Sequence, residues 1–158
     1  MNIASQWNAN VQIDSAFGSV INPQETALDG FIPSGLAADL KARALTGKPI
    51  RIGLIGSGMM GGDIVTQVLH MQGIVVAAIA DIHIPGALAA LLDAGHAPTA
   101  HRVTDTQSSF DQAVRDGHIA ITQDAQLVCR SELIDVVVDA TGKPVVGAQI
   151  GMSAMQHG

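Results

Sequence analysis

Three glycines in the spacing GxGxxG, followed by an aspartate 20 residues later, constrain the fold of this chain more than any other feature. The glycines are Gly56, Gly58 and Gly61, and the aspartate is Asp81. An apolar segment, 50–55, precedes the glycines, and a second one, 74–80, leads directly into the aspartate. Between them, apolar residues recur at the spacing of one helix face: Met60, Ile64, Val65, Val68 and Leu69. The pattern predicts a βαβ unit, with the helix ending at 72–73.

The residue types in this unit suit the binding of a dinucleotide. Gly56 permits a tight turn out of the first strand, Gly58 leaves room for a pyrophosphate, and Gly61 lets the helix pack against the strand. Free N–H groups and the positive end of the helix dipole would stabilise the phosphate charge. Asp81 can accept hydrogen bonds from the ribose hydroxyls. The alternative is a glycine-rich turn in an unrelated α/β domain, and the strand that ends in Asp81 favours the dinucleotide.

Helices and strands continue to alternate after this unit. The apolar segment 134–139 indicates a strand, a short strand is also expected at 101–104, and 119–121 is a further short apolar segment. Helices are expected at 84–94, from a capping box of Ser108 and Asp111 to about 116, at 124–132 and at 145–156. A helix with Ser34 as its N-cap, carrying Leu36, Leu40 and Leu45 on one side, is expected before the first strand.

This alternation predicts an α/β fold of the Rossmann type, a doubly wound parallel sheet with helices on both faces. Residues 34–158 would form this domain, and residues 1–33 are an extension of unknown structure because Asn-Pro and Ile-Pro pairs interrupt any periodicity. Since the sequence stops directly after a helix, we expect the sheet to be truncated before its last strands. An unpaired strand edge would then favour a homo-oligomer or aggregation.

A second group of candidate contacts follows the strand at 134–139. Asp139 is followed by Ala140, Thr141 and Gly142 at the carboxyl end of a central strand, where open α/β sheets bind their ligands. Thr141 can hydrogen-bond a cofactor, and Gly142 can let it pass closely; a plain strand-to-helix turn is the alternative. Lys143 is interpreted as a solvated lysine at a helix start rather than a catalytic group.

Composition excludes several classes of function. The net charge of −6 and the eight Lys and Arg residues, which form no cluster, argue against nucleic-acid binding. No apolar run approaches the roughly 18 residues of a membrane span, and the N-terminus lacks the features of a signal peptide. The single cysteine, Cys129, is expected to be a structural thiol in a reducing, cytoplasmic compartment. The histidine spacing supports no metal site.

Four stretches carry a resemblance to a known family: KARALTGKPIRIGLIGSGMMGG, VVAAIAD, ITQDAQLVCRSELIDVVVDATG and GAQIGMSAMQHG. They resemble the N-terminal NAD(P)-binding domain of homoserine dehydrogenase-like oxidoreductases, most closely the deoxyxylulose phosphate reductoisomerase-like branch that often carries a SAF domain. The resemblance spans residues 36–158. It implies that Asp81 contacts the ribose and that Ala140, Thr141 and Gly142 line the cofactor cleft. The pyrophosphate loop would consist of Gly56, Ser57, Gly58, Met59, Met60 and Gly61.

The choice between NAD and NADP stays open at this point. The carboxylate of Asp81 would repel a 2′-phosphate and favours NAD, whereas the resemblance implies NADPH. The expected function is hydride transfer between nicotinamide and a carbonyl or hydroxyl carbon of a small polar substrate, which a C-terminal domain absent from this chain would mainly bind. The catalytic residues are therefore unknown. The alternatives are a regulatory domain that binds NAD(H) without turnover and, ranked lower, an S-adenosylmethionine-binding domain.

Overall fold

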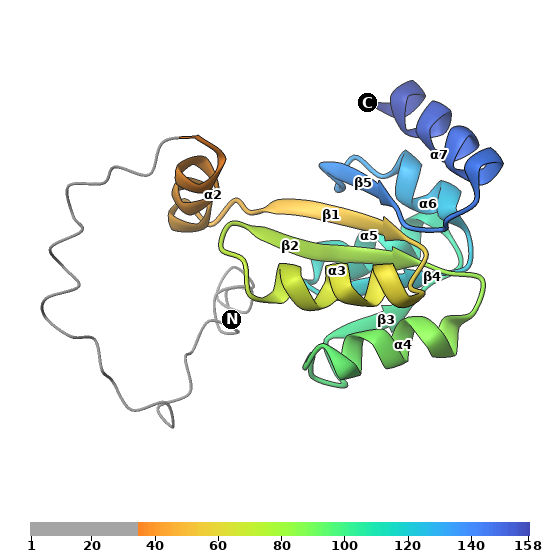
Figure 1. The fold of residues 1–158 in the computed structure, drawn as a ribbon, viewed down its shortest axis with the longest axis horizontal. Coiled ribbons are helices and arrows are strands. Elements are labelled where there is room, and N and C mark those ends of the chain that lie inside the picture. The colour runs from red at the N-terminus through yellow and green to blue at the C-terminus, as the bar shows by residue number, and fades with distance from the viewer. Residues whose placement is uncertain (1–34) are drawn as a thin grey trace, which may run out of the picture.

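Five parallel strands form a single sheet in the computed structural model, which describes residues 35–158. The predicted extension, 1–33, and the predicted N-cap Ser34 lie outside these residues. The strand order across the sheet is β3-β4-β2-β1-β5 (Figure 1). The strands are β1 (Ile50–Ile55), β2 (Ile74–Ala80), β3 (His101–Val103), β4 (Ile119–Thr122) and β5 (Val136–Asp139).

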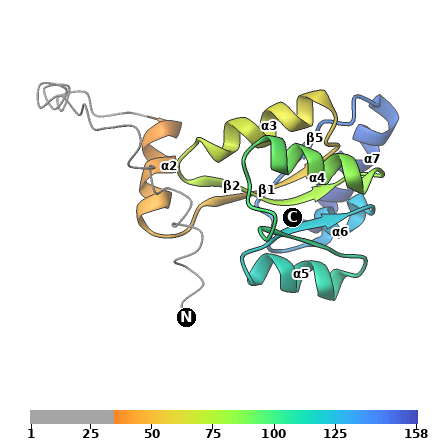
Figure 2. The ribbon, with the colours of Figure 1, turned by 90° about the horizontal axis from the view of Figure 1, so that it is seen from below.

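Helices cover both faces of this sheet. α3 and α4 lie on one face, while α5 and α6 lie on the other and α7 packs beside α6 (Figures 1 and 2). The predicted α/β fold, a Rossmann-type doubly wound sheet, is therefore confirmed. The helices are α2 (Leu36–Leu45), α3 (Met59–Leu69), α4 (Ile84–Asp93), α5 (Gln107–Arg115), α6 (Ala125–Arg130) and α7 (Pro144–His157).

A bulge in β2 distributes its side chains between the two cores. Ile52 of β1 pairs with Val76, but the next residue, Gly53, pairs with Ala78, so Ala77 is the extra residue. As a result Ala77 and Ala78 both contribute to the core beneath α5 and α6. Alternation along the strand is thereby interrupted, as expected where one strand carries one more residue than its neighbour.

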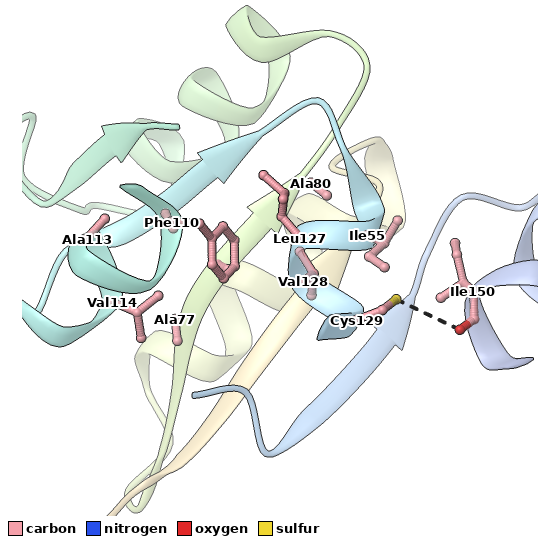
Figure 3. Close-up of a cluster of buried hydrophobic side chains, with 12 residues drawn as sticks. Ile55, Ala77, Ala80, Phe110, Ala113, Val114, Leu127, Val128, Cys129 and Ile150 are labelled. Atoms are coloured by element: carbon pink, nitrogen blue, oxygen red, sulfur yellow. Dashed lines mark hydrogen bonds between the residues drawn. The ribbon is translucent and has the colours of Figure 1, made fainter. Parts of the chain in front are cut away.

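Gly53 has a packing role that its place in a strand does not reveal. A Cβ atom at this position would overlap a methyl group of Val128, and it would also contact Ile134 at 3.0 Å. Because the glycine has no side chain, α6 can pack directly on β1. Val128 and the neighbouring Cys129 then belong to the core that contains the fully buried Phe110 (Figure 3).

Cys129 is the buried structural thiol that the sequence predicted. Its side chain is 6% exposed, and its Sγ lies 3.9 Å from the carbonyl oxygen of Ile150, which links α6 to α7 (Figure 3). Burial raises the pKa of the Cys129 thiol, an effect that a hydrogen bond with Ser153 only partly opposes. The thiol therefore stays protonated and unreactive.

Three local predictions were wrong. α5 is capped by Thr106 in a capping box with Ser109, not by Ser108 with Asp111, and Asp111 instead accepts a hydrogen bond from the hydroxyl of Ser131. Of the three leucines expected on one side of α2, only Leu40 is buried, because α2 lies beyond the amino ends of β1 and β2 and contacts the turn at Gly73 through Leu40 (Figure 1). Met60 does not join the buried stripe of α3, because in the first turn of this helix Gly61, not Met60, faces the end of β1.

Candidate functional site

The carboxyl ends of β1, β2 and β5 bring most of the predicted site residues together. Gly56 and Ser57 follow β1, Asp81 follows β2, and Ala140 follows β5. Since β1 lies between β2 and β5, this edge includes the point where the connections of a doubly wound sheet diverge to its two sides. Ligands of open α/β sheets bind at such a point.

Gly56 is required by both its conformation and its neighbours. Its φ is +93°, in the left-handed region that favours glycine. A Cβ atom there would lie 2.9 Å from the backbone carbon of Ala140 and 3.0 Å from the nitrogen of Thr141. The turn after β1 and the turn after β5 are therefore in close backbone contact, which places the predicted pyrophosphate loop next to the predicted cofactor cleft.

The start of α3 offers unpaired hydrogen-bond donors. Within residues 35–158, the backbone N–H groups of Gly58, Met59 and Met60 have no acceptor, and no side chain caps the helix. A Cβ atom at Gly58 would meet nothing within 4 Å, so the space in front of these donors is open. Free N–H groups at the positive end of a helix dipole form an anion-binding site.

The two methionines of the loop extend outward from it. Met59 is 90% exposed and Met60 is 68% exposed. Neither side chain packs in the apolar core, so both can contact a ligand that lies across the start of α3. This exposure agrees with their predicted place in the pyrophosphate loop, although it contradicts the place of Met60 on the packed stripe.

Asp81 is held against the glycine-rich turn by three donors. One carboxylate oxygen accepts hydrogen bonds of 2.6 Å from both the backbone N–H and the hydroxyl of Ser57, and the other accepts one of 2.8 Å from the backbone N–H of His83. Burial by itself raises the pKa of Asp81, but the hydrogen bonds from Ser57 and His83 outweigh it and lower the pKa below its ordinary value. The carboxylate is therefore ionised near neutral pH.

Removing the Ser57 hydroxyl should shift this titration. In Ser57→Ala, the pKa of Asp81 should rise, because burial still disfavours the charge while one stabilising hydrogen bond is lost. The lowered pKa of Asp81 stabilises the folded protein, and this stabilisation is lost only as the pH falls through the folded-state pKa. The wild type should therefore keep it to a lower pH than Ser57→Ala does, below about 4. NMR titration of the Asp81 carboxyl carbon measures the shift, with the exposed Ser108→Ala as control; equal titration curves in all three proteins would contradict the prediction.

The turn after β5 is ordered by its own side chains. Asp139 accepts a hydrogen bond of 3.0 Å from the N–H of Thr141, and the hydroxyl of Thr141 accepts one of 3.3 Å from the N–H of Lys143. A Cβ atom at Gly147 would overlap the carboxylate of Asp139, so this carboxylate also sets how α7 leaves the sheet. Gly142 is exposed, and a Cβ there would meet no atom within 4 Å. Thus Thr141 adjoins Gly56, while Gly142 lies at the open rim.

Sequence reasoning missed the contribution of β4 to this edge. The carbonyl oxygen of Thr122 accepts a 2.9 Å hydrogen bond from the N–H of Asp81, and the side chain of Gln123 donates one of 2.9 Å to the carbonyl of Ile82. Thr122 is almost fully buried, and its hydroxyl accepts a hydrogen bond from Asp124. β4 thereby supports the part of the candidate site that contains Asp81. Its short apolar segment gave a signal for a strand, but none for its place beside β2.

Two kinds of feature are absent from the described residues. No three His, Cys, Asp or Glu side chains within residues 35–158 gather closely enough to hold a metal ion. None of the helices in that range has the length and apolar character needed to cross a membrane. The sequence matches no protein-family model and no curated protein. The family resemblance of the four stretches therefore remains a prediction.

Proposed function

We propose that this protein binds a nicotinamide dinucleotide at the carboxyl edge of its sheet, as the cofactor-binding part of an oxidoreductase. The observation that carries this proposal is the row of three unpaired N–H groups at Gly58, Met59 and Met60, which faces open space next to an ionised aspartate. A pyrophosphate needs these donors, and a ribose needs the acid. The residues present thus fit the pyrophosphate and the ribose of an adenosine diphosphate group.

The ribose would be recognised by the remaining hydrogen-bonding capacity of Asp81. A carboxylate offers about four lone-pair sites, and Ser57 and His83 occupy three of them. One site therefore stays available for a ribose hydroxyl. Thr141, whose hydroxyl proton has no acceptor among residues 35–158, would contact the dinucleotide from the β5 side.

The same geometry favours NAD over NADP. A 2′-phosphate would lie against the charged carboxylate of Asp81, and the turn between β2 and α4, Ile82-His83, contains no Lys or Arg to compensate it. Like charges placed together at an interface weaken binding strongly. The proposal thus differs from the NADPH preference that the family resemblance implies.

When bound, a nicotinamide ring exchanges a hydride with a carbonyl or hydroxyl carbon, and the protein supplies orientation and electrostatics. We propose this reaction class for a small polar substrate, with a regulatory NAD(H)-binding domain as the alternative. We assign Lys143 no part in the proposed chemistry, because its side chain is exposed at the start of α7 and its backbone N–H donates to the hydroxyl of Thr141.

Fluorescence titration with NADH and NADPH tests the proposal. NADH should bind at least about tenfold tighter than NADPH, and Asp81→Asn should narrow this ratio by removing the charge that repels the 2′-phosphate. S-adenosylmethionine, titrated by calorimetry, should not bind. Failure of both nicotinamide cofactors to bind at millimolar concentration would refute the proposal, and an unchanged ratio in Asp81→Asn would refute the role of the aspartate.

A further inference from the structure

A cavity lies at the edge of the sheet opposite the candidate dinucleotide site. Its volume is about 770 Å³, and its walls come from the end of α2, the starts of β1 and β2, and the end of α5. Figure 1 shows α2 beyond the amino ends of β1 and β2, away from their arrowheads. The volume lies within the roughly 300–1,000 Å³ range of small-molecule sites.

Half of the cationic side chains of the protein line this cavity. They are Arg43, Lys48, Arg51 and Arg115, four of the eight Lys and Arg residues in the sequence. Asp135 is the single carboxylate in the cavity wall, which leaves four positive charges against one negative charge in a chain of net charge −6. The prediction that the cations form no cluster is therefore wrong in three dimensions. A concave surface of one sign concentrates ligands of the opposite charge.

Arg51 is fixed in place while most of its donors stay unused. Its Nε lies 3.3 Å from an oxygen of Asp135, which also accepts a hydrogen bond of 2.8 Å from the backbone N–H of Arg51. The two terminal nitrogens of the guanidinium have no acceptor in the described part of the chain. A guanidinium held in this way can present its remaining N–H groups to two oxygens of one phosphate.

The other three cations have no carboxylate partner within residues 35–158. Arg43 and Arg115 lie in the last turns of α2 and α5, where cations offset a helix dipole. The carbonyl oxygens of these helix ends are already paired, however: Arg43 accepts from the N–H of Lys48, and Ala113 from that of His118. A role at a helix end also does not account for the positions of Lys48 and Arg51, because these two residues lie outside the helices.

Apolar side chains complete the cavity. Leu45 and Met71 both line it, although they are 82% and 45% exposed. We propose that this cavity is a second ligand site, which binds a small organic phosphate: the cations hold the phosphate, and the exposed apolar side chains contact the organic part. The site is separate from the proposed dinucleotide site and does not depend on it.

Amide NMR spectra of the full chain, titrated with inorganic phosphate and with phenyl phosphate, test this inference. Both should shift the backbone amides of residues 47, 48, 50 and 51 and of 72–75 and 114–115. Phenyl phosphate should bind more tightly because its ring covers Leu45 and Met71. The double variant Lys48→Gln/Arg115→Gln should bind about tenfold more weakly. Its control is Lys41→Gln/Arg130→Gln, which removes two cations that do not line the cavity.

The controls make each outcome decisive. Because all four substituted residues are exposed, both double variants should keep the unfolding midpoint of the wild type. Equal weakening in the two double variants would overturn the inference, since it would show attraction to overall charge. Shifts confined to residues 56–61, or no shifts at millimolar ligand, would overturn it as well. A Gly58→Val variant should retain these shifts even though it loses the dinucleotide.

Discussion

Replacing Gly58 with valine should abolish dinucleotide binding while the protein stays folded. Gly58 has an extended backbone, with φ −61° and ψ −166°, that any residue can adopt. A Cβ atom there meets nothing within 4 Å, so the free protein has room for the new side chain. The bound pyrophosphate would need that same space, and the valine would block its approach to the unpaired N–H groups of Met59 and Met60. We expect the affinity for NADH to fall by at least about a hundredfold.

Thermal unfolding separates this effect from a loss of structure. Glycine is a better helix N-cap than valine, so Gly58→Val should cost about 1 kcal/mol and lower the midpoint by a few degrees. Gly151→Val is the matched control, because its Cβ also meets nothing within 4 Å but it lies in α7. Its NADH affinity should equal that of the wild type. Retention of NADH binding by Gly58→Val would mean that the helix start does not hold the pyrophosphate.

Periodicity was sufficient to predict the layered fold, because each element here carries its own local signal. β1 and β2 are almost entirely apolar, as strands covered on both faces must be. The helix ends predicted at 94 and at about 116 also agree with the structure, since α4 ends at Asp93 and α5 at Arg115, each two residues before a glycine of positive φ. The sequence could therefore predict the strands and helix ends that such local signals determine.

The failed capping prediction shows where such signals become ambiguous. Thr106, Ser108 and Ser109 all have hydroxyls suited to a helix start, so the residue types alone do not select one. Tertiary contacts decide: Thr104 bonds to Ile121 of β4 through both its N–H and its hydroxyl, which ends the extended segment and places the turn at Thr106. This contact joins residues 17 positions apart in the sequence, so the local periodicity of apolar residues cannot predict it.

The two candidate sites also differ in how far local sequence signals could predict them. The candidate dinucleotide site could be proposed from the sequence because its main parts are one βαβ unit and the end of one further strand, each with a recognisable spacing. The cationic cavity could not, since Arg43 and Arg115 come from different helices and meet only through the order of the strands. The place of β4 beside Asp81 was hidden for the same reason.

Gly61→Ala should destabilise the fold, in contrast to the tolerated change at Gly58. A Cβ atom at Gly61 would overlap the carbonyl oxygen of Gly56 and come within 3.6 Å of Leu54. The overlapping atom belongs to the backbone, and Gly56 cannot retreat because it is already packed against Ala140. α3 would therefore have to move away from β1, and we expect a loss of about 3 kcal/mol, at the upper end of the usual cost of overpacking.

The adjacent Gly62 provides a control of the same chemistry in the same helical turn. Its Cβ would meet only the Cβ of Ala90, at 4.0 Å, so alanine fits without strain. Gly62→Ala should stabilise the protein by up to about 1 kcal/mol, because alanine favours a helix more than glycine does. Denaturant unfolding of both variants measures the difference. Because the two substitutions are identical and adjacent, opposite signs would show that contact between α3 and the β1 turn, rather than helix propensity, requires the third glycine of the motif. Equal effects would contradict this packing.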